Sequence, residues 1–384
     1  MSMQSPLAAT AAPPAPPALP TPPPPPAPPA PVVPTRPGPI PPLAVEAAAW
    51  EAPEFPAPSF TACQVRTMTL TDEDGVVGEH KLLISSSGNI YRLVRTIRKA
   101  IYGSVKDSVQ AEVSNGTIRW CRDESGEMIR FAIKAMPWET INRLRGKCAE
   151  DAFQEVGASG HLARGGGHPN VATPIESLDD GQKVYLVTPF KLGGEMFDLI
   201  TEGRLPEPQG KAMARQIISG TVYLHQMMLC HHDLSLENTI MDKEKVTPSI
   251  IDLGMSVLMP QGIDHTGSMW RYLLQADNRG GKASYICPEV YKQLDYDGVA
   301  CDAFALGSML FLMLVGAPPW NVASRADPRF KMLVWDRNVH ELLERWGRPL
   351  SAEAVDLIQG LWTYDKYLRL TPERALQHPW LQPH

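Results

Sequence analysis

Four polar residues in the middle of the 384-residue chain carry the groups that a phosphoryl transfer requires. Lys134 ends an apolar run, Asp233 and Asn238 belong to one short segment, and Asp252 precedes Leu-Gly. An ammonium group can bind phosphates, and carboxylate and amide oxygens are the ligands that Mg²⁺ prefers. A further carboxylate can accept the proton of an attacking hydroxyl. The set therefore indicates phosphoryl transfer with Mg²⁺ as a cofactor.

The segments around these residues follow one another in an order that is typical of one enzyme family. They resemble the Val-Ala-Ile-Lys, His-Arg-Asp-Leu-x-x-x-Asn, Asp-Phe-Gly and Ala-Pro-Glu signatures of eukaryotic protein kinases. The resemblance covers about residues 91–381 and is to serine/threonine kinases of the calcium/calmodulin-dependent or cyclic-nucleotide-dependent kind. It implies transfer of the γ-phosphoryl group of ATP to serine or threonine of a protein substrate. The four segments are Phe131–Lys134, His231–Asn238, Asp252–Gly254 and Cys287–Glu289.

The resemblance implies a role for each polar residue. The phosphate contact, the catalytic base and the two Mg²⁺ ligands would be Lys134, Asp233, Asn238 and Asp252. A glutamate of the next helix, expected over about residues 150–162, would hold the lysine. Glu155 fits this position best, and Glu150 is the alternative.

The run that ends near residue 190 resembles the hinge segment that binds adenine. Thr188 would be the gatekeeper, while Pro189 and Lys191 would offer backbone groups, Pro189 only its carbonyl because it lacks an N–H. Glu195 would reach the ribose of ATP or a basic residue of the substrate. Three apolar residues would enclose the adenine ring, namely Val105, Ala132 and Ile240.

The glycine-rich loop departs most from the family pattern. Aligned on Gly103, the expected G-x-G-x-x-G reads Arg-Lys-Ala-Ile-Tyr-Gly, so two of its three glycines are absent. The resemblance implies that Gly103, the glycine that is kept, binds ATP. Glycine permits a close approach of the backbone to phosphate, so Arg98 and Ala100 should weaken ATP binding. The charges of Arg98 and Lys99 could offset this loss, and the alternative is that both are exposed strand residues.

Two residues carry functional groups that the family usually places the other way round. Ser235 stands at the position of a lysine, and Lys282 stands at the position of a threonine. The resemblance puts both positions beside Asp233, so the exchange could preserve one contact. We predict that Ser235 and Lys282 take part in catalysis; the alternative is two independent substitutions with Lys282 in solvent.

Other departures bear on regulation. His232 replaces the arginine that usually binds an activation-loop phosphate, and Asn278 stands at the usual phosphorylated position. Loss of both predicts activity without that phosphorylation. Ser159 replaces a hydrophobic residue that stacks between the lobes, which should weaken the active state in the absence of a partner. The resemblance also implies structural roles for Asp302 and for a pair between Glu289 and Arg369.

These residues must be positioned by two kinds of element. From about Phe60 to Phe190 the chain reads as short strands, and beyond Gly193 the pattern becomes helical. The predicted fold is therefore α+β, with a small β-rich N-lobe and a larger helical C-lobe, and the resemblance implies that it is the two-lobed protein kinase fold. Residues 1–58 would be a disordered arm rich in proline and alanine, and residues 59–90 an N-terminal extension of the kinase domain. The kinase domain would span 91–381, with the lobes divided after residue 190.

Composition weighs against other classes of partner. A net charge of −6 does not favour nucleic acid, whose phosphates attract clustered lysine and arginine. The six cysteines are scattered without a C-x-x-C pair, which predicts a reduced chain in the cytoplasm, with the nucleus as an alternative. No signal peptide and no membrane partner are expected. The longest apolar stretch, residues 303–315, is shorter than the ~20 residues that span a bilayer and is expected to be a buried core helix.

Two other functions are alternatives to an active protein kinase. A pseudokinase or scaffold, acting through its C-lobe and its Pro-rich arm, is favoured by the altered loop and by Ser159. The arm has Arg36, Pro39 and Pro42 at the spacing of an SH3 ligand, although a plain linker would also account for them. A small-molecule kinase is disfavoured because 287–289 and 318–320 resemble parts of a platform for a peptide substrate.

Overall fold

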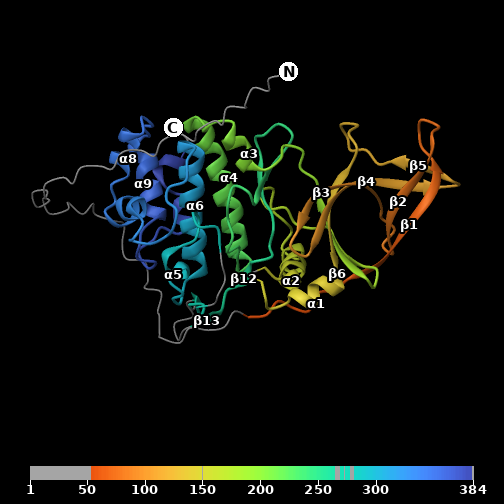
Figure 1. The fold of residues 1–384 in the computed structure, drawn as a ribbon, viewed down its shortest axis with the longest axis horizontal. Coiled ribbons are helices and arrows are strands. Elements are labelled where there is room, and N and C mark those ends of the chain that lie inside the picture. Colours follow the sequence, from red (N-terminus) through yellow and green to blue (C-terminus); the bar gives the residue numbers. More distant parts are fainter. Residues whose placement is uncertain (1–52, 149, 264–268, 272, 277–280, 383–384) are drawn as a thin grey trace, which may run out of the picture. The chain divides into compact units, whose positions relative to one another are not determined.

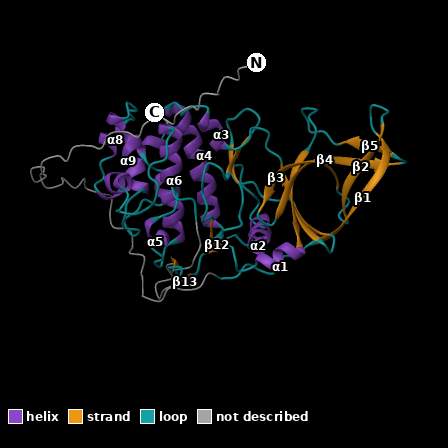
Figure 2. Ribbon diagram, in the orientation of Figure 1, coloured by secondary structure: helices purple, strands orange, loops and turns teal. Residues whose placement is uncertain are grey.

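The computed structural model describes residues 53–148, 150–263, 269–271, 273–276 and 281–382, all within one compact unit. A β-rich N-lobe precedes a helical C-lobe (Figures 1 and 2), which confirms the predicted fold class. Asn278 and the SH3-like spacing of Arg36, Pro39 and Pro42 lie outside the described residues.

The N-lobe consists of eight strands and two helices among the described residues. They are β1 (Thr61–Thr71), β2 (Val77–Ser85), β3 (Ile90–Ala100), β4 (Gly103–Ser114), β5 (Thr117–Trp120), β6 (Arg130–Pro137), α1 (Trp138–Leu144), α2 (Ala152–Ala163), β7 (Glu176–Asp179) and β8 (Lys183–Pro189). The predicted helix at about 150–162 is α2, and its start is set by Asp151, whose side chain accepts a hydrogen bond from the Phe153 N–H.

The N-lobe sheet closes on itself. Antiparallel pairing joins β1 to β2, β2 to β3, β3 to β4, β4 to β6, β6 to β8 and β8 to β7. Thr61 and Ala62 of β1 then pair in parallel with Leu178 and Asp179 of β7, which completes the ring of strands seen in Figure 2. The predicted extension at 59–90 thus supplies β1 and β2 to this sheet. A buried cluster that includes Leu83, Tyr91 and Ile133 packs its apolar side chains together.

Strand β6 shows how the sheet positions the predicted lysine. Phe131, Ile133 and Ala135 are buried, whereas Ala132 and Lys134 alternate with them and are partly exposed. Because successive side chains of a strand point to opposite faces, Ala132 and Lys134 share one face and the apolar residues share the other. Packing of the apolar face therefore fixes which way Lys134 points.

The C-lobe elements surround one large buried cluster. They are α3 (Met196–Thr201), α4 (Glu207–Gln226), β9 (Leu229–Cys230), β10 (Thr239–Met241), β11 (Pro248–Ile250), β12 (Val257–Leu258), β13 (Gln261–Ile263), β14 (Met269–Arg271), α5 (Pro288–Tyr291), α6 (Gly298–Val315), α7 (Pro328–Phe330), a π-helix (Lys331–Trp335), α8 (Val339–Arg345), α9 (Ala352–Leu361), α10 (Pro372–Ala375) and a 3₁₀ helix (Pro379–Leu381). Among the described helices, α6 alone has the length and apolarity to cross a membrane, but it is entirely buried, as expected for a core helix.

The end of the predicted Pro-rich arm differs from the expectation of a disordered segment. Residues 53–58 form no helix or strand, yet they belong to the described part of the chain and Phe55 packs against the C-lobe cluster. A single large apolar side chain near the end of a proline-rich run gives too weak a pattern for sequence to place it in a core.

Candidate active site

A cavity of about 440 Å³ is lined by residues of both lobes. Its apolar walls include Val105 and Ala132 from the N-lobe sheet and Ile240 from β10, as predicted from sequence. The hinge-like residues Thr188, Pro189, Lys191 and Glu195 also line it, together with the polar residues Lys134, Glu155 and Asp252. The cavity thus combines apolar surface with a few convergent charges, which is the usual form of a small-molecule site.

Lys134 and Glu155 form a buried ion pair within the cavity. The Lys134 Nζ lies 2.6 Å from the Glu155 Oε2 and 3.7 Å from the Asp252 Oδ1. Burial alone would lower the pKa of Lys134, but the Glu155 and Asp252 carboxylates outweigh it and raise that pKa. Glu155 is therefore the glutamate that contacts Lys134, and the alternative choice of Glu150 is excluded for this contact.

Glu150 lines the cavity, although the sequence predicted it only as an alternative partner of Lys134. It lies just before α2, and a side chain at Gly254 would come within 3.5 Å of its Cγ. Burial and the nearby Asp252 carboxylate raise the pKa of Glu150. A loop carboxylate has no fixed period to follow, so the sequence carries no signal for this placement.

Asp252 is held in an uncommon backbone conformation. Its φ is 67°, a left-handed value that costs a residue with a side chain of order 1 kcal/mol or more and is typical of functional sites. Burial would raise the pKa of Asp252, but the Lys134 ammonium and the Gly254 N–H, which donates to Oδ1, bring it below its ordinary value. The carboxylate is therefore charged at neutral pH and faces the cavity as an anion.

Asp233 and Asn238 are locked together in the loop after β9. The Asn238 amide nitrogen donates to the Asp233 carbonyl at 2.9 Å and to its Oδ2 at 2.6 Å. Since both hydrogen bonds use the nitrogen, the amide oxygen of Asn238 is the atom left for a cation. The pair thus offers a positioned carboxylate and a hard oxygen ligand next to each other.

The predicted exchange of hydroxyl and ammonium is a direct contact in the structure. The Lys282 Nζ lies 3.0 Å from the Asp233 Oδ2 and donates to the Ser235 Oγ at 2.8 Å. Ser235 is fully buried, and its Oγ also accepts a hydrogen bond from the Asn238 N–H at 3.2 Å. Lys282 is thus not a solvated loop lysine, and Ser235 connects it to Asn238.

Comparison with known proteins decides the family. The protein kinase domain model matches residues 114–381, which is more than half of the chain. The chain belongs to the protein kinase family. It is 32% identical over 214 residues to a probable serine/threonine-protein kinase of Saccharomyces cerevisiae and 30% identical over 272 residues to a serine/threonine-protein kinase of Phytophthora infestans. It is also 31% identical over 218 residues to myosin light chain kinase A of Dictyostelium discoideum.

These alignments differ in how much of each protein they cover. They include 55%, 67% and 56% of this chain and 13%, 65% and 69% of the yeast, Phytophthora and Dictyostelium relatives, respectively. The chain therefore spans less than two thirds of the first two relatives. Protein kinase domains in general use ATP and Mg²⁺ and act on proteins. The yeast and Phytophthora relatives are serine/threonine kinases by name, and the Dictyostelium relative is a myosin light chain kinase by name.

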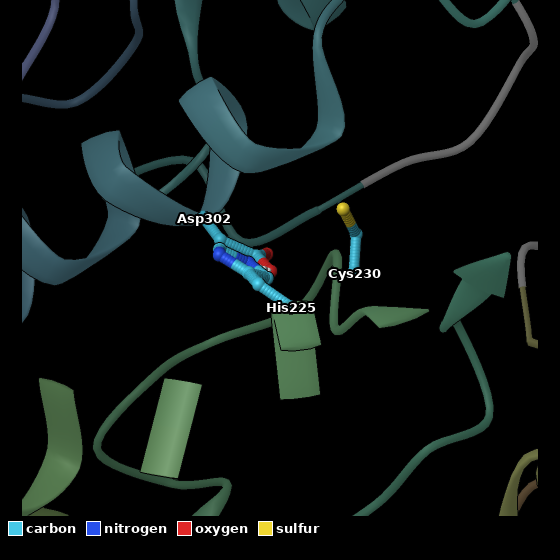
Figure 3. A group of neighbouring side chains, drawn as sticks. All are labelled: His225, Cys230 and Asp302. Carbon is cyan, nitrogen blue, oxygen red and sulfur yellow. Dashed lines mark hydrogen bonds and ion pairs between the residues drawn. The ribbon is translucent and has the colours of Figure 1, made fainter. Parts of the chain in front are cut away.

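Helix α6 anchors the loop that carries Asp233 and Asn238. The Asp302 carboxylate accepts the backbone N–H of His231 and of His232, each at 2.9 Å, and lies 2.9 Å from the His225 Nε2 (Figure 3). Burial would raise the pKa of Asp302, but the His225 hydrogen bond and the histidine charges bring it below its ordinary value. Figure 3 also shows Cys230 beside His225 and Asp302, so these three side chains lie close enough to hold a metal ion. The hydrogen bonds of Asp302 to the backbone indicate instead that the three residues form a structural anchor.

A second buried pair connects α5 to the segment before α10. The Arg369 guanidinium donates two hydrogen bonds to the Glu289 carboxylate at 2.5 and 3.0 Å, and both side chains are buried. Burial would raise the pKa of Glu289, but Arg369 outweighs it and the pKa lies below its ordinary value. This is the pair that the resemblance implied.

Replacing Glu289 by glutamine should destabilise the kinase by about 3–5 kcal/mol, because the buried Arg369 charge then has no counter-ion. The measurement is urea-induced unfolding, with Asp336→Asn as control, since the Lys331–Asp336 pair is half-exposed and should change stability by less than about 1 kcal/mol. Folding lowers the pKa of Glu289 below the ordinary glutamate value of about 4.3. The contribution of the ion pair to the free energy of unfolding is therefore complete above about pH 4.3 and is lost as the pH falls through the lowered pKa. The two proteins should thus converge in stability in acid; equal stabilities at pH 7 would contradict the assignment.

The altered glycine-rich loop is the hairpin between β3 and β4. Gly103 is needed for packing rather than as a wall of the cavity, because a Cβ there would come within 2.1 Å of the Ala135 carbonyl oxygen. The Tyr102 side chain is buried, and its hydroxyl donates to the Glu150 carbonyl at 2.6 Å. The hairpin is thereby tied to the segment that precedes α2.

Arg98 does more than occupy an exposed strand position. Its Nη1 lies 2.7 Å from the Glu195 Oε1, and both residues line the cavity. The predicted ribose contact of Glu195 is therefore in competition with an arginine that stands at the position of a glycine. Both side chains are partly exposed, so the ion pair is weak and can open.

Replacing Arg98 and Ala100 by glycine should lower the apparent KM for ATP by about two- to fivefold. The change breaks the Arg98–Glu195 ion pair, which is worth no more than about 1 kcal/mol, and so frees Glu195. It also lets the backbone of the hairpin approach the phosphates. The measurement is initial rate against ATP concentration for the Arg98→Gly, Ala100→Gly variant. Lys99→Gly is the control, because it adds flexibility and removes a charge from the same hairpin without opening the ion pair. A higher KM in the double variant would mean that Arg98 itself binds phosphate.

Proposed function

We propose that this protein transfers the γ-phosphoryl group of ATP to serine or threonine residues of protein substrates. The observation that carries the proposal is the intact Lys134–Glu155 ion pair facing Asp252 in a cavity of nucleotide size. A fixed cation and a fixed anion on one cavity wall match a polyphosphate and its metal. The supporting family relationship is that all three compared relatives are serine/threonine kinases or a myosin light chain kinase.

Each polar group has a part in this reaction. Lys134 would bind the α- and β-phosphates, and the Asp252 carboxylate and the free amide oxygen of Asn238 fit the oxygen ligands of Mg²⁺. Mg²⁺, when bound there, would neutralise part of the phosphate charge. Asp233 would orient the substrate hydroxyl and take its proton, while Lys282 holds the Asp233 carboxylate through its Oδ2.

Activity without phosphorylation of the activation loop is part of the proposal. His232 offers no guanidinium, and its ring lies edge-on to Tyr296 with the ring centroids 4.9 Å apart. A phosphate would lack the bidentate partner that arginine gives. We therefore expect the unphosphorylated protein, purified from a host that lacks protein kinases, to be active without further treatment.

The experiment is transfer of radiolabel from γ-labelled ATP to a generic basic protein in the presence of Mg²⁺. The matched control is Asp233→Asn, which keeps the shape of the side chain and removes the base. We expect label on serine or threonine with the parent protein and loss of transfer with the variant or on chelation of Mg²⁺. Equal labelling by both proteins, or nucleotide binding without any transfer, would instead support the pseudokinase alternative that the altered loop suggests.

A further inference from the structure

The segment before β1 packs on the outer face of α2. Phe55 approaches Gly157 so closely that a Cβ at this glycine would lie 2.6 Å from the Phe55 Cβ. The Phe55 ring also lies edge-on to His161, one helical turn further along, with the ring centroids 6.3 Å apart. The side chain is half-buried and packs against the large buried cluster, to which α2 contributes Ala158 and Leu162.

A second aromatic residue fixes the other end of this segment. Phe60 packs edge-on to Trp138, with the centroids 5.8 Å apart, and Trp138 in turn packs on Phe153 of α2. Between the two phenylalanines stand Pro56 and Pro58, whose rings fix φ and keep the chain extended. The segment Pro53–Phe60 is thus a short, stiff strap with an aromatic anchor at each end; we name it the α2 strap.

The strap and the ion pair occupy opposite sides of the helix. Each residue of an α-helix turns the side chain by about 100°, so positions 155 and 157 lie about 200° apart. Glu155 contacts Lys134 at 2.6 Å, and Gly157 therefore faces away from the cavity toward Phe55. The strap therefore contacts α2 on the side opposite to the ion pair, where it can hold the helix without entering the cavity.

The face of α2 that carries Glu155 packs Ala152 and Leu162 into buried apolar clusters but has a polar residue between them. Ser159, one turn after Glu155, is buried, but its hydroxyl is bonded to the Glu155 carbonyl of its own helix at 2.6 Å. Beyond it, the His161 Nε2 contacts the Met227 carbonyl at 2.7 Å, which joins α2 to the end of α4. Since Phe55 packs on this same histidine, the strap supports the connection between α2 and the C-lobe as well.

We propose that the α2 strap is a positioning element that holds α2 so that Glu155 reaches Lys134, with Phe55 as its principal residue. The inference rests on the proposed kinase activity, because it concerns the geometry of the same site. It also revises the expectation that the whole segment 1–58 is a disordered arm: the part from 53 onward would contribute to the active arrangement.

The first test replaces Phe55 by alanine in the full chain. A displacement of about 1 Å at a reacting group can cost up to about a hundredfold in rate, so we expect kcat/KM for ATP to fall about ten- to hundredfold. Phe55→Leu should retain most of the activity, because it keeps an apolar side chain against Gly157. Glu54→Ala is the matched control on the exposed neighbour and should leave the rate unchanged. Full activity of Phe55→Ala would overturn the proposal.

The second test uses the glycine on the helix. Alanine has a higher helix propensity than glycine, so Gly157→Ala should do no harm unless the added methyl group displaces Phe55. We expect Gly157→Ala to lower kcat/KM about tenfold or more, by the same displacement of α2, and the double variant with Phe55→Ala to be no worse than Phe55→Ala alone. Independent, multiplying losses would show that the two residues do not act through one contact.

The third test asks whether Phe55 acts through the ion pair. In a Glu155→Gln background the ion pair is already broken, so adding Phe55→Ala should change kcat/KM for ATP by less than about twofold. A loss as large as in the parent protein would assign Phe55 a general structural role instead. Circular dichroism spectra of all variants at the assay temperature check that the fold is retained.

Hydrogen exchange of the α2 amides separates this inference from the proposed function, because it does not require catalysis. Phe55→Ala should accelerate exchange in α2 relative to the parent protein and to Glu54→Ala. If Phe55→Ala accelerates exchange in α2 but the parent protein has no transferase activity, the kinase function is refuted and the positioning role of the strap stands. If the parent protein is active and Phe55→Ala alters neither hydrogen exchange nor kcat/KM for ATP, the role of the strap is refuted and the kinase function stands.

Discussion

Replacing Asp252 by asparagine is expected to lower kcat for phosphoryl transfer by at least about two to three orders of magnitude, while the protein remains folded. A bound metal ion stabilises transition-state charge by several kcal/mol, and each 1.36 kcal/mol corresponds to about a factor of ten. In the proposed function Asp252 would help to hold that ion. The variant keeps the size of the side chain and leaves the Lys134–Glu155 ion pair in place. Its effect should therefore fall on catalysis rather than on stability.

The measurement is the initial rate at saturating ATP and Mg²⁺, with unfolding monitored in parallel. Asp74→Asn, in an exposed turn of the N-lobe, is the matched control for the same chemical change. Lys134→Met should also abolish transfer, but it leaves the buried Glu155 carboxylate without its cation and should cost stability as well. Asp252→Asn is the cleaner variant, and a rate within about tenfold of the parent would refute the enzymatic assignment.

The polar residues of the site could be predicted because each belongs to a short run of sequence with a fixed local role. Asp233 and Asn238 are five residues apart in one loop, so their contact depends on local geometry alone. The choice between Glu155 and Glu150 was harder, since both stand near the start of one helix. It is settled by where α2 begins: Asp151 caps the helix, which puts Glu155 within it and Glu150 before it.

Contacts between distant segments could not be predicted in this way. The parallel pairing of Thr61 with Leu178 closes the N-lobe sheet, and nothing near either residue specifies the other. The ion pair between Arg98 and Glu195 likewise joins residues 97 positions apart, through a loop whose local pattern differs from the family. Such contacts arise from the assembled fold, because period and turn patterns report only on neighbours along the chain.

Exchange of the functional groups at positions 235 and 282 should restore most of the activity that either single replacement removes. Lys282→Thr alone takes an ammonium from the Asp233 Oδ2, where it now lies at 3.0 Å. A charge-assisted hydrogen bond in a partly dry site is worth about 1.5–3 kcal/mol, or about one to two decades in rate. Ser235→Lys alone would bury a second ammonium beside Lys282 and should be at least as harmful, since Ser235 is fully buried.

The double variant places the ammonium at 235 and the hydroxyl at 282, so one cation again faces Asp233 and one hydroxyl again accompanies it. A double-mutant cycle on kcat/KM measures the coupling, because residues in contact give non-additive free energies whereas distant residues add within about 0.5 kcal/mol. Lys243→Thr, at an exposed position, is the matched control for loss of a lysine and should leave the rate unchanged. We expect a coupling of more than about 1 kcal/mol. Additive losses would mean that the contacts of Lys282 with Asp233 and Ser235 do not contribute to transfer and that the two substitutions are independent.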